Sequence, residues 1–313
     1  GVERVLIDLR DNGGGYLQAA TSLVSEFLSA GDLLVYNQGA HYPREDFKSP
    51  RDGRLRKLPI TVLVNENSAS ASEIFAGAIQ DLDRALIVGR RTFGKGLVQV
   101  PFDLPDSSVV RLTVARYYTP SGRSIQKSYA KGLEAYIEDI EDRYLHGELF
   151  SADSIPKPDT TKYYTRMGRV VYGGGGITPD VFVPRDSTGI NSYYLRLLRS
   201  GTIQRFAFSY ADMNRSRLTS FASPKALSDY LWSIGDQLVY SYASYAQGQG
   251  VPQRPGMLQE SLSILKRDLV ALVADMLGGE RNLYYRIRNE RDPEVQRALQ
   301  CLTTNEWKPT KSR

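Results

Sequence analysis

Short apolar runs alternate with helical stretches over the first 126 residues, and this alternation limits the possible folds more than any other feature of the chain. The apolar runs are rich in β-branched residues and have the length of strands, and the segments between them repeat at helical spacing. This order of elements predicts an α/β layer with a largely parallel sheet. The expected strands are residues 5–9, 33–36, 60–64, 85–88, 97–102 and 109–118, and the expected helices are residues 17–28 and 73–82.

The segment that follows is expected to interrupt this α/β core. Residues 127–165 are predicted to be an insertion that contains an amphipathic helix, and residues 166–186 are predicted to rejoin the core. The rejoining segment contains four consecutive glycines at 173–176, which a phosphate-binding loop also uses. Since the lysine and the following helix of such a loop are missing, a sharp bend between strands is favoured. The apolar positions of the insertion helix are Leu133, Ile137, Ile140 and Tyr144.

From residue 187 onward the apolar residues repeat with a period of 3.6, which predicts an α-helical C-terminal domain over residues 187–313. This part holds 17 Lys and Arg against 11 Asp and Glu. A nucleic-acid surface requires a denser basic stripe and a recognisable binding module, so we interpret these charges as solvated helix faces. The apolar stripes are Leu227, Leu231, Ile234 and Leu238; Leu262, Leu265, Leu269, Leu272 and Met276; and Val295, Ala298, Leu299 and Leu302.

Residue types that are scarce in the chain exclude several classes of protein. The single cysteine, Cys301, permits no internal disulfide and no thiolate-bound zinc or iron–sulfur cluster. No apolar run approaches the roughly 18 residues of a membrane-spanning helix. The two histidines, His41 and His146, do not follow predicted core strands and show no metal-ligand spacing, so we expect both on the surface. The sequence therefore predicts no cofactor and no metal, and any catalytic base is not a histidine.

A serine-rich segment lies where a predicted strand turns into a predicted helix. Ser70 stands at this turn, where its hydroxyl would lie at the sheet edge beside a helix N-terminus that favours developing negative charge. The same spacing to Glu73 is also that of a capping box, in which the serine only caps the helix. Ser68 and Ser72 could fill either role. The spacing alone leaves both interpretations open.

The next strand leads into a lysine between two glycines, Gly94-Lys95-Gly96. If apolar neighbours such as Phe93 enclosed this lysine, burial would disfavour its charged form, and a neutral amine can take the proton from a serine hydroxyl. The first strand ends in the glycine turn 13–15, whose backbone N–H groups could point into a cavity. With the amide of Ala71, they would form an oxyanion hole.

Together these motifs resemble the carboxyl-terminal processing peptidases, or tail-specific proteases, which are serine proteases with a Ser–Lys dyad. The resemblance covers most of residues 1–126 and 166–184 in the expected order, and residues 187–313 carry no motif of the family. The matching segments are DLRDNGGG at 8–15, VNENSASASEIFAGAIQD at 64–81, GRRTFGKGLVQ at 89–99, LTVARYYTPSGRSIQ at 112–126 and GGGGITPDVFV at 173–183.

The resemblance implies a role for each matching residue. Ser70 would be the nucleophile, Lys95 its general base and Gln99 the residue that orients the lysine. The backbone amides of Gly15 and Ala71 would form the oxyanion hole. Asp8, Arg10 and Asn12 are expected to brace the glycine turn rather than to react. The implied fold is a crotonase-like (ClpP/crotonase) α/β core that lacks its first elements here.

The resemblance also implies partners and a compartment. Family members cleave polypeptides near their C-termini, usually carry a PDZ domain before the core and act outside the bacterial cytoplasm, in the periplasm or cell envelope. We therefore expect protein or peptide substrates, an upstream PDZ domain and no nucleic acid, and a homo-oligomer is possible. The insertion and the helical C-terminal domain are additions to the family pattern.

Two other functions are compatible with the same fold. A non-catalytic relative could use the cleft to bind peptides or apolar ligands, although the intact Ser70, Lys95 and Gln99 argue against a decayed site. Coenzyme A chemistry occurs on the same type of core, but the Ser–Lys pair and the absence of an adenine-binding motif disfavour it. Acylation of Ser70 by a serine-directed probe would separate the enzyme from the binder.

Overall fold

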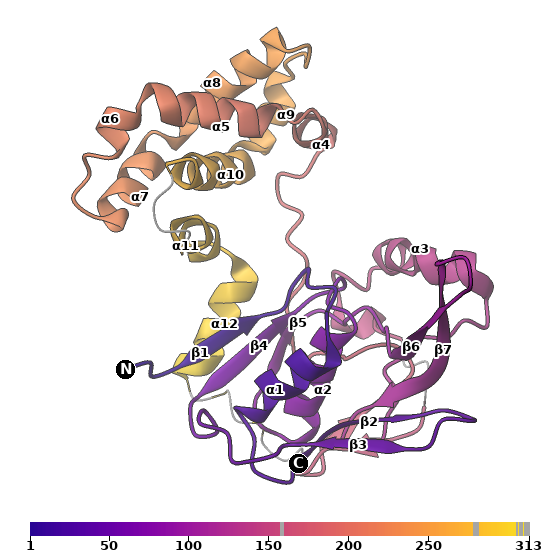
Figure 1. Cartoon of the computed structure of the whole chain (residues 1–313). Helices are drawn as coiled ribbons and strands as arrows, with labels where there is room; N and C mark the ends of the chain where they lie inside the picture. The colour runs from indigo at the N-terminus through magenta and orange to yellow at the C-terminus, as the bar shows by residue number, and fades with distance from the viewer. Residues whose placement is uncertain (157–159, 278–281, 305, 307–308, 310–313) are drawn as a thin grey trace. The chain divides into compact units, whose positions relative to one another are not determined.

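The structure is a computed structural model that describes residues 1–156, 160–277, 282–304, 306 and 309 (Figure 1). Its contacts divide the chain into two compact units. The first unit comprises Gly1–Arg185 and Arg297–Arg313, and the helical unit comprises Asp186–Gln296. The sequence predicted a helical domain over residues 187–313, whereas the structure groups Arg297–Arg313 with the first unit. Residues 157–159 of the predicted insertion lie outside the described residues.

A four-stranded parallel sheet forms the centre of the first unit. Its strand order is β1 (Val5–Asp8), β4 (Ile60–Val64), β5 (Ile87–Gly89) and β10 (Val181–Phe182), and every neighbouring pair is parallel. All five residues of β4 are buried, as expected for a continuous apolar run inside a parallel sheet. The predicted parallel layer is confirmed for these strands.

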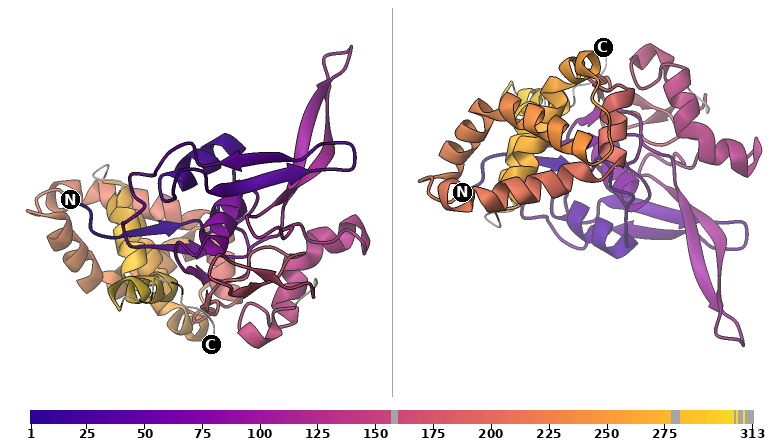
Figure 2. Two further views of the ribbon diagram at one scale, coloured as in Figure 1. Left: turned by 90° about the horizontal axis from the view of Figure 1, so that it is seen from below. Right: turned by 90° about the horizontal axis from the view of Figure 1, so that it is seen from above.

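The remaining long strands form a second, antiparallel sheet, which the prediction of one largely parallel layer did not include. Its order is β3 (Glu45–Lys48), β2 (Leu33–Gln38), β7 (Val109–Tyr118) and β6 (Leu97–Asp103). A turn too short for a crossover joins β6 to β7, so these two strands can pair only as a hairpin. The hairpin extends away from the rest of the first unit (Figure 2). The polar strand β3 was not predicted, because its sequence, EDFK, has one strand-forming residue, Phe47, among three charged residues.

Two helices lie between the sheets in Figure 1, α1 (Leu17–Ser25) and α2 (Ala71–Asp81). Helix α2 contacts strands of both sheets, and every one of its residues is buried. Its small residues permit this close packing: a Cβ at Gly77 would lie 2.7 Å from Cγ2 of Thr119. A helix buried on all sides is a rigid support for the residues at its N-terminus.

The predicted insertion helix is present as α3 (Gly132–Leu145), but its predicted apolar face does not pack against the protein. Leu133 and Ile137 are 65% and 66% exposed. The side that faces the protein carries Arg143 instead, which is only 3% exposed. The described part of the insertion also contains a 3-10 turn (Ala152–Ser154) and β8 (Tyr163–Tyr164), which pairs with β9 (Val170–Val171).

The helical unit has its own apolar core. The stripe predicted from Leu227 to Leu238 belongs to two helices rather than one, because the chain turns at Ile234 before the next helix begins at Gly235. Within the described residues, no helix has the length and apolar character to cross a membrane. The helices are α4 (Ser192–Arg199), α5 (Thr202–Met213), α6 (Arg215–Leu218), α7 (Pro224–Ser233), α8 (Gly235–Gly248), α9 (Pro255–Glu260), α10 (Leu262–Asp275), α11 (Asn282–Glu290) and α12 (Pro293–Thr303), the last spanning the boundary between the units.

Candidate active site

Ser70 occupies a strained turn between the central strand β4 and the buried helix α2. It is the N-cap of α2, with φ 57° and ψ −118°, a conformation that residues other than glycine rarely adopt. Its side chain is partly exposed, whereas Ala71, which follows it, is buried. A strained strand-to-helix turn that presents a serine is the geometry of a nucleophile elbow.

The two neighbouring serines have structural roles. Ser68 is fully buried, and its hydroxyl donates to the carbonyl oxygen of Leu9 at 2.7 Å. The hydroxyl of Ser72 donates to the carbonyl oxygen of Asn12 at 3.0 Å. Both hydroxyls therefore fasten the serine segment to the end of the first strand. Of the three serines left open by the sequence, Ser70 is the one with an accessible side chain.

The predicted glycine turn packs directly against the Ser70 turn. Gly14 has φ +92°, and a Cβ at this position would lie 2.6 Å from the carbonyl oxygen of Ala69 and 2.7 Å from the amide nitrogen of Ala71. The side chain of Asn12 accepts from the Gly14 amide at 2.9 Å, and its carbonyl oxygen accepts from the Ala69 amide at 3.0 Å. Asn12 thus braces the turn, as predicted.

Gly15 and Ala71, the predicted oxyanion-hole residues, line one cavity of about 210 Å³. The cavity wall also includes Tyr16, whose side chain is 86% exposed, and the buried Phe75. The amide of Ala71 is among the first of α2, and such amides have no acceptor within the helix. The geometry is compatible with the predicted oxyanion hole.

Glu73 joins the serine segment to the lysine segment, a role that the sequence did not reveal. Its side chain is completely buried, and its Oε2 accepts from the backbone amides of Ser70 at 2.9 Å and Lys95 at 2.8 Å. Its Oε1 accepts from the hydroxyl of Thr92 at 2.6 Å and the amide of Gly94 at 2.7 Å. The capping-box spacing correctly indicated the bond to Ser70, but the other three donors come from a segment about twenty residues away in sequence.

Burial and hydrogen bonding have opposite effects on the pKa of Glu73. Burial raises the pKa of Glu73, and the hydrogen bonds from Thr92, Lys95, Gly94 and Ser70 oppose that rise. All four partners donate to the carboxylate, so the ionised form satisfies every bond. A proton on Oε2 would face the two amide donors of Ser70 and Lys95, whereas a proton on Oε1 could be donated to the hydroxyl of Thr92. The hydrogen bonds favour the anion, but burial outweighs them, and the pKa of Glu73 lies above its ordinary value.

Lys95 departs from the prediction that apolar neighbours enclose it. The side chain is exposed, because the backbone of its segment is turned inward to bond with Glu73 while the side chain points away from the packed interior. Among the hydrogen bonds of the described residues, none joins the side chains of Lys95 and Ser70 or those of Lys95 and Gln99. Gln99 is also exposed and lines a separate cavity of about 860 Å³ beside β6 and β7. The prediction that the Lys95 amine is buried is therefore wrong for this structure, although Glu73 holds the backbone of the Ser70 and Lys95 segments together.

The remaining candidate residues do not form a second site. His41 and His146 are both exposed, as predicted. Within the described part of the chain, no three acidic, histidine or cysteine side chains gather in a metal-binding arrangement. The glycine run 173–176 forms a bend, since the amides of Gly174 and Gly176 donate to backbone carbonyls of Ser124 and Ile125.

The comparisons with known proteins show that the α/β part of the chain is similar to a family of peptidases. More narrowly, residues 1–138 match the profile of Peptidase family S41. Residues 193–279 match a family of unknown function, DUF8443, which covers most of the helical unit.

Several curated relatives match part of the chain. The chain is 43% identical over 129 residues to a C-terminal processing peptidase, chloroplastic, of Tetradesmus obliquus, covering 41% of this chain and 27% of that protein. It is 42% identical over 173 residues to a carboxyl-terminal-processing protease of Synechocystis sp., covering 55% of this chain and 38% of that protein. The chain therefore spans less than half the length of these curated relatives.

Among solved structures, a photosystem II D1 C-terminal processing protease is similar, with a TM-score of 0.41 and 32% identity. The similarity covers 59% of this chain and 35% of that one.

Proposed function

We propose that this protein is a serine endopeptidase that cleaves polypeptides near their C-termini through an acyl-enzyme on Ser70. The observation that carries the proposal is the shared oxygen of Glu73, which holds the amides of Ser70 and Lys95 within two hydrogen-bond lengths of each other. Gly14 abuts the same serine turn. Three segments far apart in sequence thus meet at Ser70, the accessible member of the three serines in this turn.

The proposed reaction begins when Ser70 Oγ attacks the carbonyl carbon of the scissile bond while its proton passes to the neutral Nζ of Lys95. The amides of Gly15 and Ala71 donate to the oxygen that becomes negative, and Gln99 orients the lysine. The C–N bond then breaks, and Lys95 gives its proton to the leaving amine. Water hydrolyses the resulting ester by the same route and restores the free hydroxyl of Ser70.

This mechanism requires a change around Lys95, whose side chain is exposed here. Base catalysis needs the unprotonated amine, and removal of surrounding water favours that form. We infer that a polypeptide bound across Ser70 covers the lysine and completes the dyad. The large cavity beside β6 and β7, which borders Gln99, offers room for the bound chain on this side.

Several wider features belong to the same proposal. We propose a crotonase-like fold for the core, with residues 127–165 as an insertion and the helical unit, Asp186–Gln296, as an added domain. An upstream PDZ domain, protein or peptide substrates, homo-oligomer formation and an exported location in the bacterial periplasm or cell envelope extend the family resemblance.

The test is peptide hydrolysis by the full-length protein and two variants. Ser70→Ala and Lys95→Ala should each abolish cleavage, whereas Lys57→Ala, which removes an exposed lysine elsewhere in the first unit, should leave it unchanged. The wild-type kcat/KM should rise between about pH 6 and pH 9, because only the neutral amine accepts a proton. Activity in either dyad variant, or a flat profile, would refute the dyad.

One observation favours a second candidate function, a non-catalytic peptide-binding relative. Among the described residues, no hydrogen bond joins the side chains of Ser70 and Lys95, and Lys95 is exposed. A serine-directed acylating probe separates the two functions: a covalent adduct on Ser70 supports the enzyme, and peptide binding without any adduct supports the binder.

A further inference from the structure

We propose that Arg143, on helix α3 of the insertion, is a positioning residue that holds the Lys95 segment in place for catalysis. Its guanidinium group donates to three consecutive backbone carbonyls of the segment that leads into Lys95. The inference rests on the proposed function of Ser70 and Lys95, and it assigns the insertion a part in the active site.

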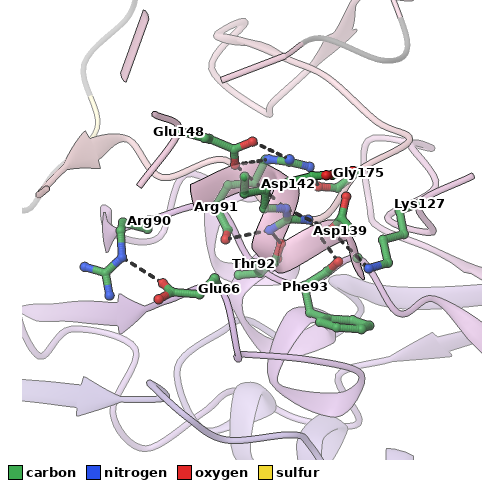
Figure 3. A network of polar contacts seen from close by, with 12 residues as sticks. Glu66, Arg90, Arg91, Thr92, Phe93, Lys127, Asp139, Asp142, Glu148 and Gly175 are labelled. Atoms are coloured by element: carbon green, nitrogen blue, oxygen red, sulfur yellow. Dashed lines mark hydrogen bonds and ion pairs between the residues drawn. The ribbon is translucent and has the colours of Figure 1, made fainter. Parts of the chain in front are cut away.

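The contacts of Arg143 are specific for a guanidinium group. Its Nη1 donates to the carbonyl oxygens of Thr92 at 2.8 Å and Arg91 at 3.3 Å, and its Nη2 donates to that of Phe93 at 3.2 Å. Its Nε lies 2.9 Å from Oδ2 of Asp139, one helical turn earlier. Figure 3 shows the polar network in which these carbonyls lie. The planar fork of arginine can serve several acceptors at once, which a lysine ammonium cannot do with the same geometry.

The Lys95 segment is thereby held from two sides. Arg143 binds its carbonyl groups, while Glu73 binds the Thr92 hydroxyl and the amides of Gly94 and Lys95. The carbonyl groups of residues 91–93 accept from Arg143, and the amides of the next two residues donate to Glu73, so each partner supplies what the other cannot. Loss of one partner would free the segment to move relative to Ser70.

A second attachment from the insertion acts on the same segment. The ammonium group of Lys127 lies 3.9 Å from the ring centre of Phe93 and 4.2 Å from that of Tyr136, and its Nζ donates to Oδ2 of Asp139 at 3.0 Å. Its backbone amide donates to the carbonyl oxygen of Gly94 at 2.9 Å. Helix α3 is therefore anchored by cations and aromatic rings that surround residues 91–94.

Because the apolar stripe of α3 is exposed, we infer that polar contacts, rather than apolar packing, attach this helix to the segment that leads into Lys95. A helix retained only to extend the core would turn Leu133 and Ile137 inward, yet both are mostly exposed. The buried side carries Tyr136, Asp139 and Arg143 instead, at helical spacing. Burying an arginine is costly unless its hydrogen bonds are made. A substitution that removes these bonds should therefore loosen residues 91–93, whose carbonyl groups accept them.

The test compares Arg143→Met, Arg143→Lys and a matched control, Arg166→Met, in the full-length protein. Arg143→Met leaves no carboxylate unpaired, because Asp139 keeps Lys127 and Glu148 keeps its bidentate pair with Arg91. Arg166 is half exposed and pairs with Asp32, so its replacement by Met removes an ion pair far from the lysine segment in sequence.

Two measurements are made on each variant. In Arg143→Met, hydrogen exchange should accelerate by about tenfold or more at the amides of Gly94 and Lys95, and not at those of β4. Its kcat should fall by roughly 10- to 100-fold with little change in KM, because the substrate still binds but the base is misplaced. Arg143→Lys should recover part of both losses, and Arg166→Met should match the wild type.

The exchange measurement separates failure of this inference from failure of the proposed function. Unchanged exchange at Gly94 and Lys95 in Arg143→Met overturns the inference, whatever the activity. Faster exchange with wild-type kcat also overturns it, since the segment then needs no such support. A wild-type protein that neither cleaves nor is acylated at Ser70 overturns the proposed function and, with it, the catalytic role of Arg143.

Discussion

The contact between the glycine turn and the serine turn predicts that Gly14→Ala disrupts the site while an adjacent glycine tolerates the same change. A Cβ at position 14 would meet two backbone atoms, 2.6 Å from Ala69 O and 2.7 Å from Ala71 N, and would lie 2.9 Å from Cβ of Ser70. Backbone atoms cannot rotate away, so the turn itself must move. The backbone at Gly14 also has φ +92°, which disfavours any residue with a Cβ.

The magnitude follows from these two effects. A left-handed conformation costs a residue with a Cβ about 1–2 kcal/mol. Forcing a methyl group into closed contacts costs about 1–3 kcal/mol in a well-packed site. We therefore expect Gly14→Ala to lower the free energy of unfolding by about 2–5 kcal/mol. The displacement should also misplace Ser70 Oγ and lower the rate of its acylation by roughly 100-fold.

Gly13→Ala is the matched control. A Cβ at position 13 has nothing within 4 Å, and its φ lies outside the left-handed range. Its free energy of unfolding should stay within about 1 kcal/mol of the wild type. Urea unfolding and the rate of adduct formation on Ser70 are measured for both variants. Equal effects of the two substitutions would refute the packing of the glycine turn against Ser70.

Three further predictions concern other parts of the chain. Glu73→Gln should lower the free energy of unfolding by roughly 1–3 kcal/mol, since the amide nitrogen cannot accept a hydrogen bond and at least the buried Gly94 amide loses its acceptor. Asp11→Asn should destabilise the protein at neutral pH but not at low pH. Burial raises the pKa of Asp11, but the hydrogen bonds from Asn67 and Asn65 and the charges of Arg10 and Arg90 together set it below the ordinary 3.8. The carboxylate therefore stabilises the fold above that value, and the benefit is lost as pH falls through the folded-state pKa. Tyr242→Phe should cost about 1 kcal/mol, because the buried hydroxyl bonds to Thr202 at 3.0 Å.

Each of these predictions has its own control and its own contradictory result. Glu138→Gln changes an exposed glutamate and should have little effect on the free energy of unfolding. An equally small effect of Glu73→Gln would contradict the role of Glu73 in joining the serine and lysine segments. For Asp11→Asn, a stability difference that persists unchanged down to about pH 2 would contradict the assigned charge interaction. Tyr240 is 49% exposed, so Tyr240→Phe should be nearly neutral, and a larger loss there than in Tyr242→Phe would reverse the expected order. Urea unfolding serves for all of them.

The sequence revealed the strand-to-helix turn at Ser70 because its signals are local: a β-branched run, small residues and a capping spacing. Glu73 was predicted only as a possible cap, since its other three donors belong to a segment that the fold brings to it. The same limit applies to Lys95. Glycines on both sides marked it as unusual, but the exposure of its side chain depends on which way the backbone between them turns.

Periodicity predicted the helix of the insertion and misassigned its buried face. The apolar positions such as Leu133 and Ile137 have correct helical spacing, yet the attachment uses Arg143 and Lys127, which ordinary patterning assigns to solvent. Such a buried cation is recognisable only when its acceptors are known. The antiparallel sheet was missed for a related reason, because strand patterns do not specify which strands pair.

The most direct test of the account is the distance between Ser70 Oγ and Lys95 Nζ in an experimental structure of the full-length protein with a peptide bound or with Ser70 acylated. The account predicts that the bound chain covers Lys95 and brings the two atoms within about 2.6–3.2 Å. If the amine instead stays in solvent and out of hydrogen-bond reach of Ser70 while the peptide occupies the site, the Ser–Lys mechanism is contradicted.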